Sequence, residues 1–426
     1  MTALDYEAYI RKHASWNFVV NVLDLTFYNL AISFIFGSTV LSLYTSHLTS
    51  SATLIGVIPA IQNVGFFLPQ LLMARYAERL PRKKPLVQKI SVMERVPYLF
   101  LALLILLWPH APAWFSYGTL VLCLGLATFS GGLAGPPWNA MLAKVIPVHR
   151  RGLLFGLSSA LGGLLGIAGA ALSRHILATY PYPISFGFSF LLCFIFQVCS
   201  WVCLSLNREP PREPGKAELT ARAYWQRLPR ILRENPNFAR YLLSRTLIIL
   251  GGMAGGFYVI YARRAFQISD AFAANLTIAA LVSQTLCTPI LGWLADRRGR
   301  KWLTELGSAG AAGALILALL SRDPAWFYGV FALMSAANAG LMVAGMTMVM
   351  DFSSPEDLPT FTALANTVLA IPILVAPMLG GRLADTVGYQ ALFGIALALS
   401  ALGWATMRWT VREPRQELAP LRSSEA

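Results

Sequence analysis

The sequence predicts an all-α membrane protein with twelve transmembrane helices, arranged as two pseudo-symmetric six-helix bundles. Three observations predict this fold class. The 426 residues are 56% hydrophobic and only 13% charged, with a mean hydropathy of +0.57, whereas soluble domains carry about 25% charged residues. The apolar residues form a dozen runs, each close to the ~20 residues that span a bilayer as a helix. A short basic segment also occurs twice, each time between two such runs.

We expect one helix for each apolar run. The strict alternation of polar and apolar residues that is typical of porins is absent from the sequence, which excludes a transmembrane barrel. The predicted helices cover residues 19–46, 52–74, 90–109, 113–141, 152–178, 184–206, 240–264, 270–294, 302–320, 325–350, 360–384 and 389–410.

The basic residues predict how the chain lies in the membrane. With a cytoplasmic amino terminus, 27 of the 34 Lys and Arg residues fall in cytoplasmic segments, and the outer loops hold only Arg174, Arg263, Arg264 and Arg322. This asymmetry is the positive-inside rule, so the net charge of +14 does not indicate a nucleic-acid partner. We expect a multi-pass protein of the cell (inner) membrane with both termini in the cytoplasm.

The amino-terminal residues lack the apolar core of a cleavable signal peptide, and residues 3–16 predict a helix at the membrane interface. The five cysteines all fall in apolar runs without neighbouring His or carboxylate side chains, as small buried hydrophobic residues do. We therefore expect no disulfide, no metal site and no cofactor.

The most specific pattern in the chain is a basic loop between two predicted helices. Residues Gly292–Lys301 read GWLADRRGRK, and a degenerate copy with Glu78, Arg79 and Arg82 lies 218 positions earlier. So many charges in a short turn must emerge at a polar face, because charges are costly in hydrocarbon. The pattern G-x-L-A-D-R-x-G-R-K resembles the loop signature of the major facilitator superfamily of transporters, and the resemblance covers essentially the whole chain.

A second sign of duplication is the pair Asn17-Phe18 and Asn237-Phe238, which recurs at an offset of 220. Between the two copies, residues 207–236 break the hydrophobic pattern with prolines and basic residues and predict a cytoplasmic linker. Two parallel six-helix halves are the arrangement of the resembling superfamily. The predicted parts are an N-terminal bundle at 1–206, the linker at 207–236, and a C-terminal bundle with a cytoplasmic tail at 237–426.

The resemblance implies that the loop charges act in gating and not in substrate binding. Asp296 would face the amino terminus of the helix that begins near Arg150, where a carboxylate gains about 0.3–1 kcal/mol from the helix dipole. Glu78 would make the symmetric contact near Thr362. Because such contacts need the cytoplasmic sides closed together, Asp296 would stabilise the outward-open state. The residues expected to gate are Gly292, Asp296, Arg297, Gly299, Arg300, Lys301, Glu78, Arg79, Arg82, Arg150 and Arg151.

Asp24 is the only acid well inside the first predicted helix, and Arg245 occupies nearly the equivalent position of the seventh. An Asp at the bilayer centre costs about 2.5–3.5 kcal/mol on insertion scales, which the apolar residues of this helix offset. Two roles stay open for Asp24, a proton or substrate site and a structural ion pair, with Arg245 as the expected partner. Glu94 and Arg95, at the start of the third predicted helix, are expected to stabilise the neighbouring charged loop.

The resemblance also implies a substrate path lined by the first, fourth, seventh and tenth helices. Asn21 and Tyr28 share one face of the first helix with Asp24. Each candidate also has a packing alternative, because prolines, aromatics and methionines shape and fill helices without binding a solute. The candidate cavity residues are Asn21, Tyr28, Gln62, Asn63, Trp138, Asn139, Tyr258, Tyr261, Gln284, Asn338 and Met342.

A largely apolar cavity with scattered amides and one acid favours an amphipathic organic solute, cationic solutes included, over a sugar or a phosphate. We expect a secondary active transporter working by alternating access, with proton-coupled efflux as its form. The sequence departs from the drug–proton antiporters of the superfamily, because it lacks their fourth-helix arginine and their fifth-helix Gly-Pro pair.

Two alternatives stay open: a lipid or lysolipid flippase of the same fold, and a non-transporting sensory or assembly protein of the membrane. The sequence contains no phosphate-binding loop, zinc-ligand spacing or nucleophile elbow, so we expect no enzymatic activity. A small-molecule substrate, membrane lipid and protons are the expected partners, and the protein is expected to be a monomer.

Overall fold

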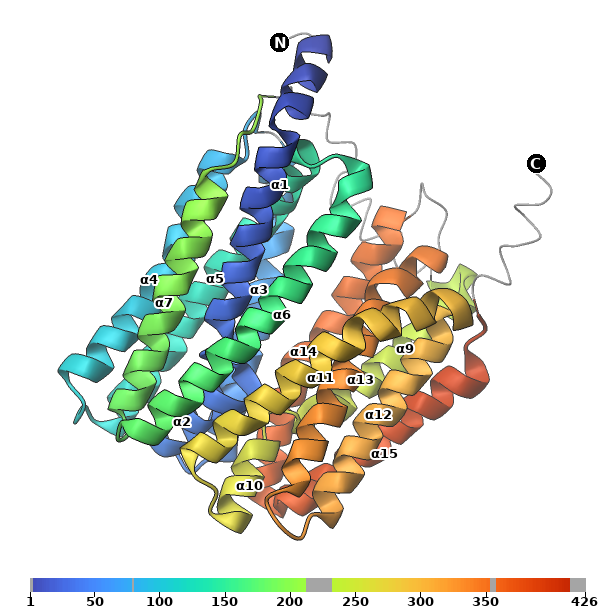
Figure 1. Ribbon diagram of the computed structural model, residues 1–426. Helices are drawn as coiled ribbons and strands as arrows, with labels where there is room; N and C mark the ends of the chain where they lie inside the picture. The colour runs from blue at the N-terminus through green and yellow to red at the C-terminus, as the bar shows by residue number, and fades with distance from the viewer. Residues whose placement is uncertain (1–2, 79, 212–231, 353–357, 414–426) are drawn as a thin grey trace. The chain divides into compact units, whose positions relative to one another are not determined.

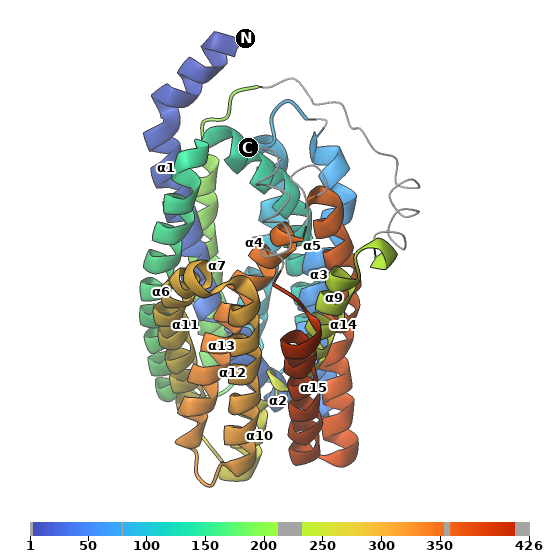
Figure 2. The ribbon, with the colours of Figure 1, turned by 90° about the vertical axis from the view of Figure 1, so that its right-hand side faces the viewer.

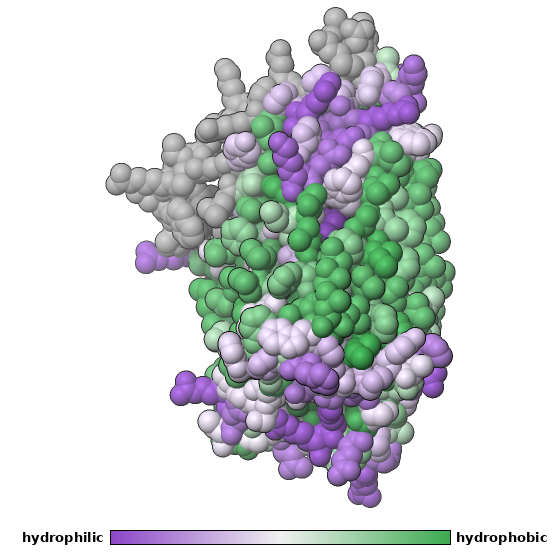
Figure 3. Space-filling model, turned by 90° about the vertical axis from the view of Figure 1, so that its left-hand side faces the viewer, coloured by the Kyte–Doolittle hydropathy of each residue, from purple (hydrophilic) through white to green (hydrophobic). Residues whose placement is uncertain are grey.

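The computed structural model describes residues 3–78, 80–211, 232–352 and 358–413. This part of the chain is built from helices, and twelve helical segments are long and apolar enough to cross a membrane. One face of the molecule shows a continuous apolar band between two polar zones (Figure 3). The predicted fold class is confirmed, while most of the predicted linker and the end of the predicted tail lie outside the described residues.

The helices follow the predicted runs closely. In chain order they are α1 Ala3–Ser33, the π-helical turn η1 Gly37–Leu41, α2 Ser42–Leu48, α3 Ala52–Glu78, α4 Lys84–Leu107, α5 Ala113–Val145, α6 Val148–Thr179, α7 Ile184–Ser205, α9 Pro236–Gly251, the 3-10 turn η2 Gly252–Ala254, α10 Tyr258–Phe266, α11 Asp270–Arg298, α12 Arg300–Leu320, α13 Trp326–Asp351, α14 Leu358–Val387 and α15 Tyr389–Thr410.

Three differences from the predicted helices have local causes. Residues 3–16 are helical, but they form the first part of α1 and not a separate helix, and α1 projects beyond its neighbours (Figure 1). The seventh predicted helix is broken into α9 and α10 by a 3-10 turn within its glycine-rich stretch, where glycine disfavours a continuous helix. Helix α4 begins at Lys84, six residues before the predicted start at 90, because its first turns are polar and escape a hydropathy pattern.

The chain forms two compact units. The first holds the described residues before Ser51, those from Ile61 to 211, and Ser269–Ile278. The second holds Ser51–Ala60, the described residues from 232 to Ile268, and those from Ala279 onward. The beginnings of α3 and α11 therefore each belong to a different unit from the rest of their helix. The domain boundaries inferred from the linker stay a prediction.

In the first unit, α1 packs against α6 and α7, while α4 packs against α5 and α7 (Figure 1). This arrangement packs the middle of α4 against two neighbouring helices, so polar side chains there are enclosed within the unit. The glycines of α6 admit α1 closely, since a Cβ on Gly162 would lie 2.8 Å from the side-chain nitrogen of Asn29. Close contacts of this kind hold helices together in a membrane.

In the second unit, α12 packs against α13 and α15, and α9 packs against α14 and α15 (Figure 2). One apolar cluster joins the starts of α9 and α14 to the ends of α13 and α15, and includes Phe238, Tyr241, Met348, Phe361 and Met407. This cluster fixes the part of α9 from which Arg245 projects.

Candidate functional site

A buried polar cluster lies between α1, α4 and α7 of the first unit. The Asp24 carboxylate on α1 is 6% exposed, and it accepts a hydrogen bond of 2.6 Å from the hydroxyl of Ser200 on α7. The side chain of Trp138 on α5 lies near Asp24 as well. Neutral polar groups of two helices therefore surround the Asp24 carboxylate.

Arg95 on α4 lies at the centre of this cluster. Its Nε donates to the carbonyl of Gln197 at 2.7 Å, and its Nη1 donates to the carbonyl of Ser91 at 2.7 Å. The second terminal nitrogen, Nη2, donates to the hydroxyl of Ser200 at 3.3 Å, so one serine links Arg95 with Asp24.

Glu94 supplies a second carboxylate to the same cluster. Its Oε2 lies 3.3 Å from Nη1 of Arg95, and its Oε1 accepts a hydrogen bond of 3.1 Å from the hydroxyl of Tyr28. Gly131 of α5 leaves room for this side chain, because a Cβ there would lie 3.1 Å from Oε1 of Glu94. Three helices, α1, α5 and α7, thus surround Glu94 and Arg95.

Helix periodicity explains how the sequence assembles the cluster. Asp24 and Tyr28 are four residues apart on α1, and Gln197 and Ser200 are three apart on α7, so each pair shares one face of its helix. Glu94 lies ten residues after the start of α4, about 15 Å along the helix. The prediction that Glu94 and Arg95 stabilise the charged loop is therefore wrong: they point into the bundle.

The charges of this cluster do not balance. Two carboxylates, Asp24 and Glu94, accompany the single guanidinium of Arg95, so the cluster carries one excess negative charge when all three are ionised. Burying an unbalanced carboxylate is costly, and such a group becomes neutral by taking up a proton. The arrangement can hold one exchangeable proton inside the bundle.

The other candidate residues of the first unit lie around this cluster in different environments. Asn21 is fully buried and paired with the Asn207 amide at 2.6 Å, so it joins α1 to the end of α7. Gln62 and Asn63 are half-buried on α3. Asn139 is exposed and donates to the carbonyl of Gly135. Tyr28 and Trp138 are thus the cavity candidates that contact the buried acids.

The candidates of the second unit do not form one cluster. Tyr258 is buried against Phe331 and Phe393, and Tyr261 packs on Phe393 as well. On the neighbouring helices, Gln284 is half-buried, Asn338 is exposed and Met342 is 63% exposed. Arg245 lies on α9 beside Gly345 of α13. Because Arg245 and Asp24 belong to different units, their predicted pairing stays a prediction.

A loop clasp closes the polar end of the first unit. Glu209, which follows α7, accepts hydrogen bonds of 2.8 and 2.7 Å from the backbone N–H groups of Lys83 and Lys84 at the start of α4. Its carboxylate also pairs with Lys144 at 2.7 Å, with both side chains nearly buried. The carboxylate thus caps one helix and ties it to the end of α5.

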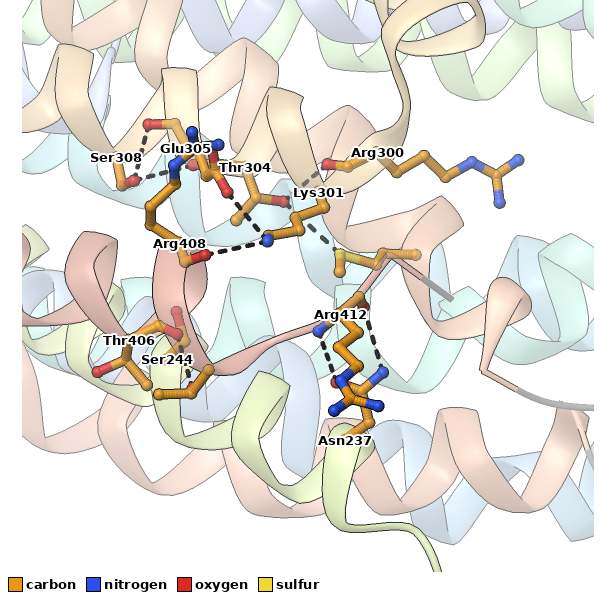
Figure 4. Close-up of polar contacts among 12 residues, drawn as sticks. Asn237, Ser244, Arg300, Lys301, Thr304, Glu305, Ser308, Thr406, Arg408 and Arg412 are labelled. Atoms are coloured by element: carbon orange, nitrogen blue, oxygen red, sulfur yellow. Dashed lines mark hydrogen bonds and ion pairs between the residues drawn. The ribbon is translucent and has the colours of Figure 1, made fainter. Parts of the chain in front are cut away.

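An equivalent loop clasp occurs in the second unit. Glu305 on α12 pairs with Lys301 at 3.5 Å and with Arg408 of α15 at 3.3 Å (Figure 4). Arg300 pairs with Asp351, at the end of α13, at 2.7 Å. Glu413 lies against Gly299, whose φ of +92° and extended ψ are a conformation that only glycine adopts readily.

Two details of these clasps repeat between the units. Asn17 donates to the carbonyl of Arg208 and accepts from its N–H, and Asn237 does the same with Arg412 (Figure 4). Each arginine begins an Arg-Glu-Pro triplet, at 208–210 and 412–414. The triplet was a signal in the sequence that could have identified Glu209 and Glu413 as residues of the clasps.

The remaining gating candidates lie at the ends of these helices. Arg297 stacks over the ring of Trp293 at 4.0 Å, and Arg151 donates to the carbonyls of Ile146 and Ala143. The others in this group, Gly292, Arg82 and Arg150, are half-buried or exposed. Arg79 and the side chains of Asp296 and Glu78 lie outside the described residues, so the predicted gating contacts stay predictions.

Charged side chains buried within membrane-spanning helices are rare and mark substrate paths or proton relays. The fold and the buried cluster therefore point to the class of multi-pass membrane transporters. Within that class, the chain belongs to the Major Facilitator Superfamily, whose family model matches residues 22–263 and again 247–426. The resemblance found in the sequence is confirmed, and the protein is a membrane transporter and not an enzyme.

Curated relatives carry transporter names. The MFS-type transporter SLC18B1 of Mus musculus is 22% identical over 380 residues, covering 84% of this chain and 78% of that protein. The multidrug resistance protein MdtG of Salmonella paratyphi C is 24% identical over 289 residues, covering 65% of this chain and 70% of that protein. The efflux pump apf11 of Gibberella fujikuroi is 26% identical over 104 residues, covering 24% of this chain and only 18% of the pump.

Solved structures of transporters share the fold. The nucleoside transporter NupG matches with a TM-score of 0.73 and 12% identity, covering 92% of this chain and 99% of NupG. The xylose transporter XylE from E. coli matches with a TM-score of 0.68 and 17% identity, covering 94% and 98%. At these identities the likeness concerns the fold alone.

Proposed function

We propose that the chain is a secondary active transporter that exports a small amphipathic organic solute in exchange for protons, by alternating access. The cluster of Asp24, Glu94 and Arg95 is the proton site in this proposal. The observation that carries it is the charge imbalance of the cluster, in which two largely buried carboxylates share one buried guanidinium.

The contacts of the cluster suggest how a proton changes it. With Asp24 and Glu94 both ionised, Arg95 is drawn between them, and Ser200 donates to Asp24. When one carboxylate takes up a proton, the cluster becomes neutral and that acid turns from an acceptor into a donor. The hydrogen bonds among α1, α4 and α7 must then rearrange, which links protonation to helix packing.

The direction of transport rests on the relatives. Efflux and multidrug resistance appear in the names of proteins that share 24–26% identity with parts of this chain. Export of an organic solute against its gradient needs an energy source, and inward proton flow is one that a buried acid cluster can use.

The test uses purified protein in proteoliposomes that carry an imposed pH gradient. Organic solutes are screened for gradient-driven accumulation, and solute–solute exchange is measured with no gradient. Asp24→Asn and Glu94→Gln each remove one ionisable acid while keeping its shape. We expect gradient-driven accumulation to fall at least about tenfold in both variants and exchange to persist, since exchange needs no net proton movement.

Asp323→Asn is the matched control, because Asp323 caps the turn before α13 and lies outside the cluster. It should accumulate solute like the wild type. Accumulation at the wild-type rate by both Asp24→Asn and Glu94→Gln would refute the proton site. A wild-type protein without flux of any solute in the panel would count against the transport proposal itself.

A further inference from the structure

Arg245 on α9 differs from Arg95 on α4, although both lie inside helices long and apolar enough to cross a membrane. Arg95 donates hydrogen bonds through all three of its nitrogens. The Nε of Arg245 is buried without a hydrogen-bond partner, and within the described part of the chain its guanidinium forms no ion pair. The residue as a whole is only partly buried.

An unpaired guanidinium is expensive at this position. Arg245 lies nine residues after Pro236, the start of α9, and so about 14 Å along a helix that is long and apolar enough to cross a membrane together with α10. Ionisable residues inside a membrane are normally paired, and those that are not are functional candidates by default. The sequence therefore keeps a costly cation that no side chain in the described part of its own unit neutralises.

A glycine lies directly against this cation. A Cβ on Gly345 of α13 would lie 3.1 Å from Nη2 of Arg245. The ring of Tyr241, one turn earlier on α9, is buried in the apolar cluster of the unit. Glycine at 345 thus admits the guanidinium against bare backbone, and a side chain at this position would displace it.

The charge of the site selects among anions. Between Tyr241 and Ala262 the chain has no other basic residue than Arg245, and α13 has none. A single positive charge balances a carboxylate, whereas a phosphate monoester carries about −1.5 to −2 at neutral pH. The planar fork of arginine also matches the two oxygens of a carboxylate.

We propose that Arg245, held against Gly345, binds the carboxylate of an amphipathic organic acid. This inference rests on the transport function proposed above and narrows its substrate class. It differs from the cationic solutes and from the Asp24–Arg245 pair that the sequence favoured. Within its own unit Asp24 already accepts a hydrogen bond from Ser200.

Binding is tested with the purified full-length protein in detergent, by ligand-induced thermal stabilisation. The probes are matched acids and amides, namely phenylacetate, cinnamate and indoleacetate with their primary amides, and phenyl phosphate. We expect at least one acid to stabilise the wild type clearly more than its amide and more than phenyl phosphate. If no acid exceeds its amide, or phenyl phosphate exceeds the acids, the proposal is wrong.

Variants then locate the binding site. Arg245→Gln should weaken the apparent affinity for the acid about tenfold or more, because charged hydrogen bonds are lost, and Arg245→Lys should be intermediate. Gly345→Ala should weaken it with the charge intact. Arg240→Gln is the matched control, since Arg240 on the same helix donates to the carbonyl of Thr410 and lies at its exposed end. Unchanged affinity in Arg245→Gln would overturn the proposal.

The same variants separate this inference from the proposed function. Asp24→Asn should keep acid binding while it loses gradient-driven accumulation. Acid binding without any transport would defeat the proposed function alone. Gradient-driven transport of an acid that survives Arg245→Gln would defeat the carboxylate site alone.

Discussion

Replacing Arg95 tests the energetic role of the buried cluster. The guanidinium makes four polar contacts, at 2.7 Å to the carbonyls of Gln197 and Ser91 and at 3.3 Å to Glu94 and Ser200. Arg95→Met keeps most of the volume but leaves two carboxylates without a counter-charge. Removing one partner of a buried ion pair costs about 3–5 kcal/mol, so we expect the free energy of unfolding to fall by that amount.

The assay is unfolding of the purified protein in mixed micelles, titrated with sodium dodecyl sulfate and followed by tryptophan fluorescence. Arg174→Met, at an exposed position of α6, is the matched control and should change the free energy by no more than about 0.5 kcal/mol. Adding Glu94→Gln to Arg95→Met removes one unbalanced acid and should recover part of the loss, with a coupling of about 0.5–3 kcal/mol. An Arg95→Met protein as stable as the control would refute the reasoning.

Two further predictions concern the loop clasps and use the same unfolding assay. Glu209→Gln removes the carboxylate charge that pairs with Lys144 and caps α4. Because the side chains of Glu209 and Lys144 are both nearly buried, we expect the free energy of unfolding to fall by about 3 kcal/mol. A loss below about 0.5 kcal/mol would mean that the clasp is not structural. Gly299→Ala forces a side chain into a backbone conformation with a φ of +92° and should cost about 1–3 kcal/mol. Gly292→Ala, where a Cβ would meet nothing within 4 Å, is its control, and an equal effect of the two substitutions would contradict the strain.

The membrane-spanning helices could be predicted from sequence because their length and polarity are set by the bilayer itself. The last helix was predicted at 389–410 and is Tyr389–Thr410, and α12 begins at Arg300 against a predicted 302. Both helices follow a glycine with positive φ, Gly388 and Gly299. A helix end marked by a glycine and by charges can be read locally, without knowledge of the packing.

The candidate site could be predicted only in part. Asp24 is conspicuous in the sequence as an acid in an apolar run, but its hydrogen-bond partner Ser200 lies 176 positions away, and Arg95, which donates to the same serine, lies 71 positions away. Glu94 and Arg95 were misplaced because the polar first turns of α4 hid where that helix begins. Which helices pack together depends on contacts between residues far apart in the sequence, and the periodicity of a single helix does not reveal those contacts.

Arg245 and the clasps show two other limits. The Arg-Glu-Pro triplets at 208–210 and 412–414 were visible in the sequence, but only the structure shows Glu209 capping α4. The sequence singles out Arg245 because its position is nearly equivalent to that of Asp24, whereas the absence of an ion pair to Arg245 among the described residues is visible only in three dimensions.

Acid titration of the reconstituted protein, followed by infrared difference spectroscopy, tests most directly whether the buried cluster takes up a proton. We expect a carboxylic acid C=O band that titrates in the wild type, loses intensity in Asp24→Asn or Glu94→Gln, and disappears when both substitutions are combined. The band should be unchanged in Asp323→Asn. A titrating band that survives the combined substitution, or its absence from the wild type, would contradict a proton site at Asp24, Glu94 and Arg95.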